Sequence, residues 1–375
     1  MRYRLLKLFS CISLFLMEGC IEPFSPPEVN SPENYLVVDG FLNVGQDTSR
    51  IELSRTQNVN DNAKPTIETG ASISVEAESG EKYDFSETRS GLYTLSPKQY
   101  SMAGKYRLRV KTQDGKEYLS EYVTVSLTPP IDSVTTKFDS FQDAMVFYVN
   151  AHDAHGKTQF YRWKFEETWE YRAAYNSYIE VIDKKYVTRT KDINQCWGSQ
   201  RSGSILLGTT VKLSSDVIKD LPIFRVPVST NKLFIKYSVL VRQYGLSRAA
   251  FEYWTTLSKT TQGTGSLFDP QPSQVTGNIK NTANNKELVF GYFSASTEET
   301  KRLTITPRLG KYATCMPADT FDVVCKPISN YQCGLETTAL MLSYAGMRSE
   351  FVLGTPQSCA DCRVQGGTTD RPKFW

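Results

Sequence analysis

The feature that most constrains this chain is a series of short segments in which apolar and polar residues alternate. Six such segments recur between residues 35 and 128, with glycines in the turns between them. They are Tyr35–Leu42, Arg50–Arg55, Ala71–Ala77, Gly91–Leu95, Lys105–Lys111 and Tyr118–Val125. A period of two puts the apolar side chains on one face of a β-strand, so each segment is expected to bury one face. Six or seven strands in this length predict an immunoglobulin-like β-sandwich over residues 35–128.

The alternation is interrupted at Thr128-Pro-Pro-Ile-Asp132, which predicts a domain boundary. Residues 129–375 are then expected to form a larger β-rich domain with one or two short helices, so the fold class is mainly β. Its strand patterns are Val134–Phe138, Met145–Ala151, Phe160–Tyr171, Ile205–Leu213 and Lys232–Tyr244.

One helix is expected in this second domain, beginning after Ser247, which is a favourable N-cap. Leu246 and Phe251 could form a hydrophobic staple at its start. Phe251, Trp254 and Leu257 would lie along one side of the helix. Such an aromatic stripe could be a ligand platform, but a stripe of this kind more often packs against a sheet.

The first twenty residues have the layout of a secretory signal. Arg2, Arg4 and Lys7 precede an apolar core at Leu8–Met17. About ten apolar residues are too few for a membrane-spanning helix, which needs about 20. The signal therefore predicts export rather than a transmembrane segment.

The end of this signal, Gly19-Cys20, resembles a bacterial lipoprotein box. In such a box the cysteine is lipidated with diacylglycerol and palmitate and becomes the new N-terminus. The prediction is a signal peptide at 1–19, lipidation of Cys20 and a proline-containing, semi-rigid tether at 20–34. The alternative is an ordinary secretory signal with an incidental cysteine.

The mature chain would be almost neutral. Removing residues 1–19 takes away three of the 43 Lys and Arg and one of the 40 Asp and Glu, which leaves 40 basic against 39 acidic residues. Without a run of like charges there is no electrostatic basis for a nucleic-acid partner. A content of 40% hydrophobic and 12% aromatic residues is ample for ordinary cores.

Six cysteines remain beyond Cys20, and an even number in an exported chain predicts disulfides. They are Cys196, Cys315, Cys325, Cys333, Cys359 and Cys362. Five follow residue 314, so the crosslinks should staple the C-terminal part, although six cysteines allow 15 pairings. The spacing of Cys359 and Cys362 also fits a zinc knuckle or a redox pair, but a second closely spaced pair and a βαβ context are missing.

Nothing in the sequence predicts a catalytic centre or a cofactor. The only two histidines, His152 and His155, occur where a hairpin turn needs Asp and Gly, so a turn is favoured over a metal site. No glycine-rich phosphate loop follows a strand, and no G-x-S-x-G motif is present. A pair of carboxylates assembled by the fold, as in glycosidases, has no positive support in the sequence.

The order of these features resembles one family, domain of unknown function 4249. The matching motifs run along nearly the whole mature chain. They are Cys20-Ile-Glu-Pro-Phe, Leu36-Val-Val-Asp-Gly, Ile51-Glu-Leu-Ser, Gly91-Leu-Tyr, Gly104-Lys-Tyr-Arg-Leu, Pro130-Ile-Asp-Ser-Val, Tyr161-Arg-Trp, Cys196-Trp197, Thr276-Gly-Asn-Ile279, Gly291-Tyr-Phe-Ser-Ala295, Cys359-Ala-Asp-Cys-Arg363, Gly366-Gly and Pro372-Lys-Phe-Trp375.

The resemblance implies a lipoprotein of the Bacteroidota outer membrane that is associated with a TonB-dependent receptor. No catalytic residue is carried over from the family; only Cys20 is, as the lipidation site. In this phylum, lipoproteins often reach the cell surface when acidic residues follow the lipidated cysteine. Glu22 alone lies close to Cys20 here, so membrane attachment is the firmer expectation and surface exposure stays open.

The leading hypothesis is a non-enzymatic lipoprotein that binds or gates a nutrient, such as a peptide, a glycan or a metal complex, for the receptor. Trp163, Trp169, Tyr171 and Trp197 are available for a binding face, although most are expected in cores. The alternatives are a structural adhesin and a surface hydrolase of glycans or peptides.

Overall fold

A computed structural model of the chain describes residues 34–56, 66–182, 185–261, 275, 277–310, 315, 321–323, 339–344 and 352–375. Tyr35–Trp375 forms one compact unit. The expected signal, Cys20 and the tether up to residue 33 lie outside the described residues. The described part is mainly β, which confirms the predicted fold class.

Twelve strands form the first sheet. They are β1 (Leu36–Asn43), β2 (Ser49–Arg55), β3 (Ser72–Ala77), β4 (Lys82–Asp84), β5 (Ser86–Arg89), β6 (Leu92–Leu95), β7 (Lys105–Lys111), β8 (Glu117–Ser120), β9 (Val123–Ser126), β19 (Ile279–Asn281), β20 (Val289–Gly291) and β21 (Ala295–Ser296).

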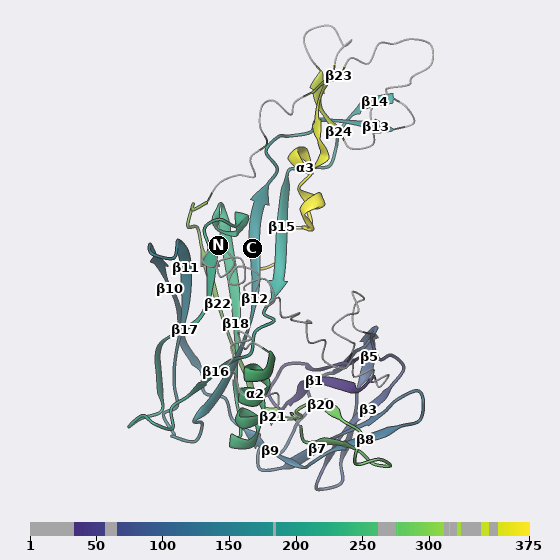
Figure 1. Ribbon diagram of the computed structural model, residues 1–375, viewed down its shortest axis with the longest axis vertical. Helices are drawn as coiled ribbons and strands as arrows, with labels where there is room; N and C mark the ends of the chain where they lie inside the picture. Colours follow the sequence, from purple (N-terminus) through teal and green to yellow (C-terminus); the bar gives the residue numbers. More distant parts are fainter. Residues whose placement is uncertain are drawn as a thin grey trace, which may run out of the picture. The chain divides into compact units, whose positions relative to one another are not determined.

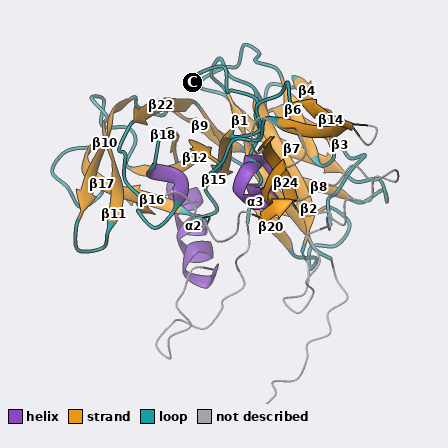
Figure 2. Cartoon of the chain, turned by 90° about the horizontal axis from the view of Figure 1, so that it is seen from above, coloured by secondary structure: helices purple, strands orange, loops and turns teal. Residues whose placement is uncertain are grey.

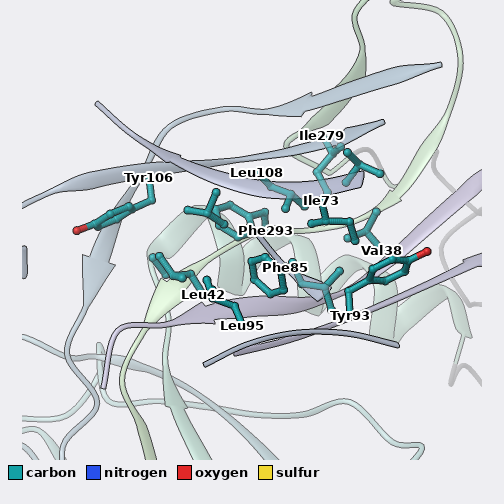
Figure 3. Packing of buried hydrophobic residues seen from close by; sticks show 14 of the residues in the cluster. Val38, Leu42, Ile73, Phe85, Tyr93, Leu95, Tyr106, Leu108, Ile279 and Phe293 are labelled. Atoms are coloured by element: carbon teal, nitrogen blue, oxygen red, sulfur yellow. The ribbon is translucent and has the colours of Figure 1, made fainter. Parts of the chain in front are cut away.

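The alternating residues of this sheet fill one core. Val38 and Leu42 from β1 meet Ile73 from β3 and Leu108 from β7, and all four are at most 2% exposed. Figure 3 shows these side chains pointing toward one another between two layers of strands. The arrangement is consistent with a sandwich, because the two layers share one apolar interior.

The first sheet extends beyond the expected range of 35–128. β19 pairs with β8, while β20 and β21 pair in parallel with β1. β21 also pairs with β9, so it joins the two layers. Phe293, between these late strands, is fully buried in the same core. Residues 279–296 are therefore an integral part of the N-terminal sandwich.

Two more sheets form a second β-layered body. A three-stranded sheet has the order β10-β11-β17, and a five-stranded sheet has the order β15-β12-β18-β22, with β16 also paired to β12. Their bounds are β10 (Ile131–Asp139), β11 (Ala144–His152), β17 (Val217–Pro227), β12 (Phe160–Arg172), β15 (Gln195–Arg201), β16 (Leu206–Thr209), β18 (Lys236–Gly245) and β22 (Glu298–Ile305). In Figure 1, β12, β18 and β22 run side by side. Phe147 from β11 and Trp163 from β12 lie in the shared core.

Helix α2 (Arg248–Thr261) follows β18, where the sequence predicts a helix. Ser247 caps it, since its hydroxyl accepts a hydrogen bond from the Ala250 amide at 3.2 Å. Tyr253 and Trp254 are buried. They pack with Phe160 from β12, so the aromatic stripe faces a sheet as expected. Figure 2 shows α2 as the longer of the two labelled helices. A short 3-10 turn, η1 (Asn231–Leu233), precedes β18.

The remaining elements are short. They are β13 (Ile179–Ile182), β14 (Lys185–Thr188), β23 (Phe321–Val323), β24 (Ala339–Tyr344), β25 (Val352–Pro356), α3 (Gln357–Ala360) and η3 (Cys362–Gln365). β13 pairs with β14, and β25 lies between β23 and β24.

Two disulfides hold this region, which confirms the prediction of disulfide bonding. Cys196 on β15 is bonded to Cys362, and Cys315 is bonded to Cys359. The two cysteines of the Cys359-Ala-Asp-Cys362 motif therefore pair with other partners rather than with each other. Cys325 and Cys333 lie outside the described residues.

His152 ends β11, and His155 lies in the turn that follows. The His152 Nδ1 atom is 2.8 Å from the Asp132 carboxylate. Within the described ranges, no three His, Cys, Asp or Glu side chains gather closely enough to hold a metal ion.

No helix in the described part of the chain is both long enough and apolar enough to cross a membrane.

Candidate functional site

A groove of about 540 Å³ lies between the β1–β2 hairpin and one face of the five-stranded sheet. This volume falls within the range of about 300–1,000 Å³ that is usual for ligand sites. The lining residues are Asp39, Gly40, Phe41, Thr48, Arg50, Glu52, Lys164, Phe165, Glu166, Arg201, Ser202, Arg242, Tyr244 and Glu298. The groove is therefore built from both layered bodies, and charged side chains dominate its walls.

Strand alternation explains why charges collect on this face. On β12, Tyr161 and Trp163 are fully buried in the core, so Arg162, Lys164 and Glu166 point to the opposite face. Pairing between the strands places Tyr244 beside Arg162 and Arg242 beside Lys164. One strand thus contributes an apolar layer to the core and a charged row to the groove.

Ion pairs connect the two walls and brace the sheet. Lys164 on β12 binds Asp39 on β1, with its Nζ atom 3.1 Å from the carboxylate. Arg242 lies 2.6 Å from Glu298, and the Tyr244 hydroxyl donates to the same carboxylate at 2.6 Å. Burial alone would raise the pKa of Asp39, but Lys164 and Arg162 hold it below its usual value. Asp39 is thereby kept ionised.

Arg162 does not line the groove itself but a side pocket next to it. Its guanidinium is stacked on the Trp254 ring, 3.5 Å from the ring centroid. Its Nε atom is buried and has no hydrogen-bond acceptor. Arg162 borders a side pocket of about 30 Å³ that shares Asp39 and Lys164 with the groove. A pocket of this size has room for about one or two small polar groups. An arginine remains charged even when buried. The Nε–H group of Arg162 therefore stays a hydrogen-bond donor without an acceptor.

Glu166 has no close ion-pair partner among the described residues, although it interacts with Arg242 and Arg302 at longer range. Neither Glu166 nor Arg162 has an ion pair within 4 Å or a side-chain hydrogen bond among the described residues, and the same holds for Arg50 on the opposite wall. Arg162 interacts with Asp39 only at longer range. The groove and its side pocket together therefore offer two cations, Arg50 and Arg162, and one anion, Glu166, to a ligand.

The chain's own C-terminal residues cover the adjoining part of the same sheet face. The guanidinium of Arg302 lies 3.5 Å from the Phe374 ring centroid, and the Lys236 Nζ atom lies 4.7 Å from the Trp375 ring. The Trp375 indole donates to Glu170 at 3.1 Å. Arg302 is paired with Leu240, whose other neighbour is Glu166. The covered and open parts of the face are therefore continuous.

The aromatic residues that the sequence offers for a binding face lie mainly in cores. Trp163, Tyr171 and Trp197 are 0%, 3% and 8% exposed, respectively. Trp169 packs against the disulfide cluster that contains Cys196 and Cys362. Trp254, which was expected to pack against a sheet, does so and also borders the side pocket. Cys20 lies outside the described residues.

The sequence did not single out Asp39, Lys164 and Glu166 of the groove or Arg162 of the side pocket. One signal was present in Phe160–Glu166, where charges occupy every second position from Arg162. This pattern is normally that of a solvated face, and the sequence does not show that β1 will cover it.

Comparison with known proteins gives one family. The model of the family described as Domain of unknown function (DUF4249) matches residues 21–302, a range that contains every residue lining the groove. No curated protein matches the chain. Among solved structures, the chain is similar to the native conformation of alpha-2-macroglobulin from E. coli, at 10% identity and a TM-score of 0.19. That similarity covers 59% of this chain and 14% of the other.

Proposed function

The chain belongs to the DUF4249 family, and from this premise we propose that it is a lipid-anchored outer-membrane protein. In this proposal it binds a nutrient ligand in the groove between β1–β2 and the five-stranded sheet. It then presents that ligand to a TonB-dependent receptor.

The groove is the observation that carries the binding role. Its walls come from separate sheets and are joined by the Asp39–Lys164 ion pair. Arg162 and Glu166 lack close partners of opposite charge in the described structure. The Arg162 Nε donor is costly to leave unpaired, because a buried donor without an acceptor costs about 1–3 kcal/mol. A bound ligand would supply the hydrogen-bond acceptor that the fold does not provide.

The Asp39 carboxyl of the groove does not suit the general-acid role of a glycosidase. A glycosidase needs a carboxyl group with a raised pKa as general acid. The pKa of Asp39 is instead held low by Lys164 and Arg162, although burial opposes this. Burial raises the pKa of Glu299, but that residue does not line the groove.

Membrane attachment is supported by the layout of residues 1–20, and the receptor by the family resemblance. Attachment through acyl chains would follow from about 0.8 kcal/mol for each buried CH₂ group. We expect Cys20→Ser to leave the body folded and to move it from the membrane fraction to the soluble fraction. If the variant stays with the membranes, the lipid anchor is wrong.

Co-purification tests the receptor. Tagged full-length protein is extracted from outer membranes in mild detergent, and the proteins that accompany it are identified by mass spectrometry. A TonB-dependent receptor should be enriched over a preparation from cells that express Cys20→Ser. A clean preparation without any such receptor would refute the partnership.

A further inference from the structure

Arg162 in the side pocket and Glu166 in the groove are separated by a defined spacing. Arg162 and Glu166 lie four positions apart on β12 and on the same face. At about 3.3 Å per residue their backbone positions are separated by roughly 13 Å. A ligand that compensates both must carry an anion at one end and a cation at the other, about this far apart.

The anion end is suited to a carboxylate. The guanidinium fork of an arginine matches a carboxylate in two parallel hydrogen bonds. The side pocket beside Arg162 has a volume of only about 30 Å³, which admits a small planar group. The Trp254 ring, which also lines the side pocket, stacks on the guanidinium and orients it before any ligand binds. Lys164 is bonded to Asp39 and is less free to take part.

The sheet face already accommodates a peptide next to this site. Phe374 and Trp375 lie on Arg302 and Lys236, on the same face as Glu166. The contacts combine cations of the sheet with peptide aromatic rings, together with the indole hydrogen bond to Glu170. Peptide chemistry is therefore compatible with the continuation of the groove.

A glycan fits the walls less well. Sugars are commonly bound on the open face of an aromatic ring. Here the Phe41 and Tyr244 rings pack edge to face at 4.9 Å, and the Trp254 ring is covered by Arg162. These aromatic side chains pack against one another and against Arg162, so they do not present a flat ring face to a sugar.

We infer that the groove selects short extended peptides of about four residues, with the C-terminal carboxylate at Arg162 and the amino group at Glu166. An extended peptide rises about 3.3 Å per residue, so four residues match the spacing of the two charges. The inference rests on the proposed ligand-binding function and names its ligand class.

Equilibrium dialysis tests this with the full-length protein in mild detergent. The probe is a mixed pool of tetrapeptides with free ends, compared with the same pool amidated at the C-terminus and with a pool of neutral oligosaccharides. We expect the free pool to be retained and the amidated pool to bind about ten- to a hundredfold more weakly, because a hydrogen-bonded charge is lost. Equal retention of both peptide pools would overturn the inference.

Variants assign the two ends. Arg162→Lys keeps the charge but loses the fork, so binding of the free pool should weaken about tenfold while the amidated pool is unaffected. Glu166→Gln should weaken binding of peptides with a free amino group but not of N-acetylated peptides. Arg172→Gln, on the same strand outside the groove, is the matched control. Melting temperatures identify any variant that fails to fold, and the pools of modified peptides test the wild-type protein independently of any variant.

The outcomes separate the two proposals. Retention of oligosaccharides without peptides would overturn the peptide inference and leave the binding function intact. Retention of neither pool would overturn the peptide inference, while co-purification of the receptor would still decide the partnership. Weakening by Arg162→Lys that is equal for the free and amidated pools would show that the arginine does not contact the carboxylate.

Discussion

The bridge between Cys196 and Cys362 is expected to be a major source of stability. It closes a loop with a sequence separation of 166 residues, and both cysteines are fully buried. In the chain-entropy treatment, a loop of this size destabilises the unfolded state by about 5 kcal/mol. The inner bridge, with a separation of 44 residues, shortens the effective loop but changes this by only about 0.3 kcal/mol, since the cost grows with the logarithm of length.

The double variant Cys196→Ala/Cys362→Ala removes this bridge without burying new polar groups. For a cooperative unit of roughly 340 residues, an unfolding entropy of about 2.1 cal/mol/K per residue converts 5 kcal/mol into a fall in Tm of about 7 °C. Thermal unfolding followed by tryptophan fluorescence measures it. Cys315→Ala/Cys359→Ala is the matched control, with an expected loss of about 4 kcal/mol.

The same change should loosen the C-terminal residues. The Cys362 carbonyl accepts from the Tyr171 hydroxyl at 2.8 Å, and the bridge lies just before the segment that carries Phe374 and Trp375. Hydrogen exchange over residues 362–375 should therefore accelerate more than exchange in β7. A Tm within about 1 °C of the wild type, with unchanged exchange, would refute the view that this bridge holds the tail on the sheet.

Three further changes test the fold. Trp163→Phe removes the indole that donates to the buried Gln243 at 2.8 Å, so the free energy of unfolding in urea should fall by about 1–3 kcal/mol; an unchanged midpoint would contradict this. Gly291→Ala should lower the free energy of unfolding in the same assay by at least about 1–3 kcal/mol. The φ of Gly291 is +128°, and an added Cβ would lie 2.1 Å from a β1 carbonyl oxygen. A variant as stable as the wild type would show that β20 pairs differently. The Asp132 carboxylate raises the pKa of His152 above 6.5. The pair therefore stabilises the fold below pH 6.5, and this contribution is lost as the pH rises through the raised pKa. NMR titration should show that the pKa of His152 falls in Asp132→Asn.

Much of the local structure could be predicted from the sequence because strand periodicity is a local property. The alternation in Lys105–Lys111 corresponds to β7 without a shift, and Ser247 caps the expected helix. Tyr118–Val125 was expected to be one strand, but the structure divides it into β8 and β9, separated by Glu121 and Tyr122. The pattern of alternation does not show where a strand leaves one pairing partner for another.

The long-range features could not be predicted, for a physical reason. Val289–Gly291 pairs with β1 although about 250 residues separate them, and no local pattern encodes such a partner. The groove depends on the same kind of contact. In the sequence, Lys164 resembles an ordinary solvated strand residue. Only the structure shows that it forms an ion pair with Asp39 from the N-terminal sandwich. Similarly, the alternatives open for Cys359 and Cys362 could be resolved only once their spatial partners were known.

The most direct test of the central claim is photoaffinity labelling of the full-length protein with the tetrapeptide pool carrying a diazirine side chain. Labelled segments are mapped by mass spectrometry. The account predicts labels on β1–β2, on β12 near Lys164 and on β18 near Tyr244, all suppressed by an excess of unlabelled free-acid peptides. Labels confined to other surfaces, such as the exposed Phe141 at the β10–β11 turn, or labels that excess peptide does not suppress, would contradict it.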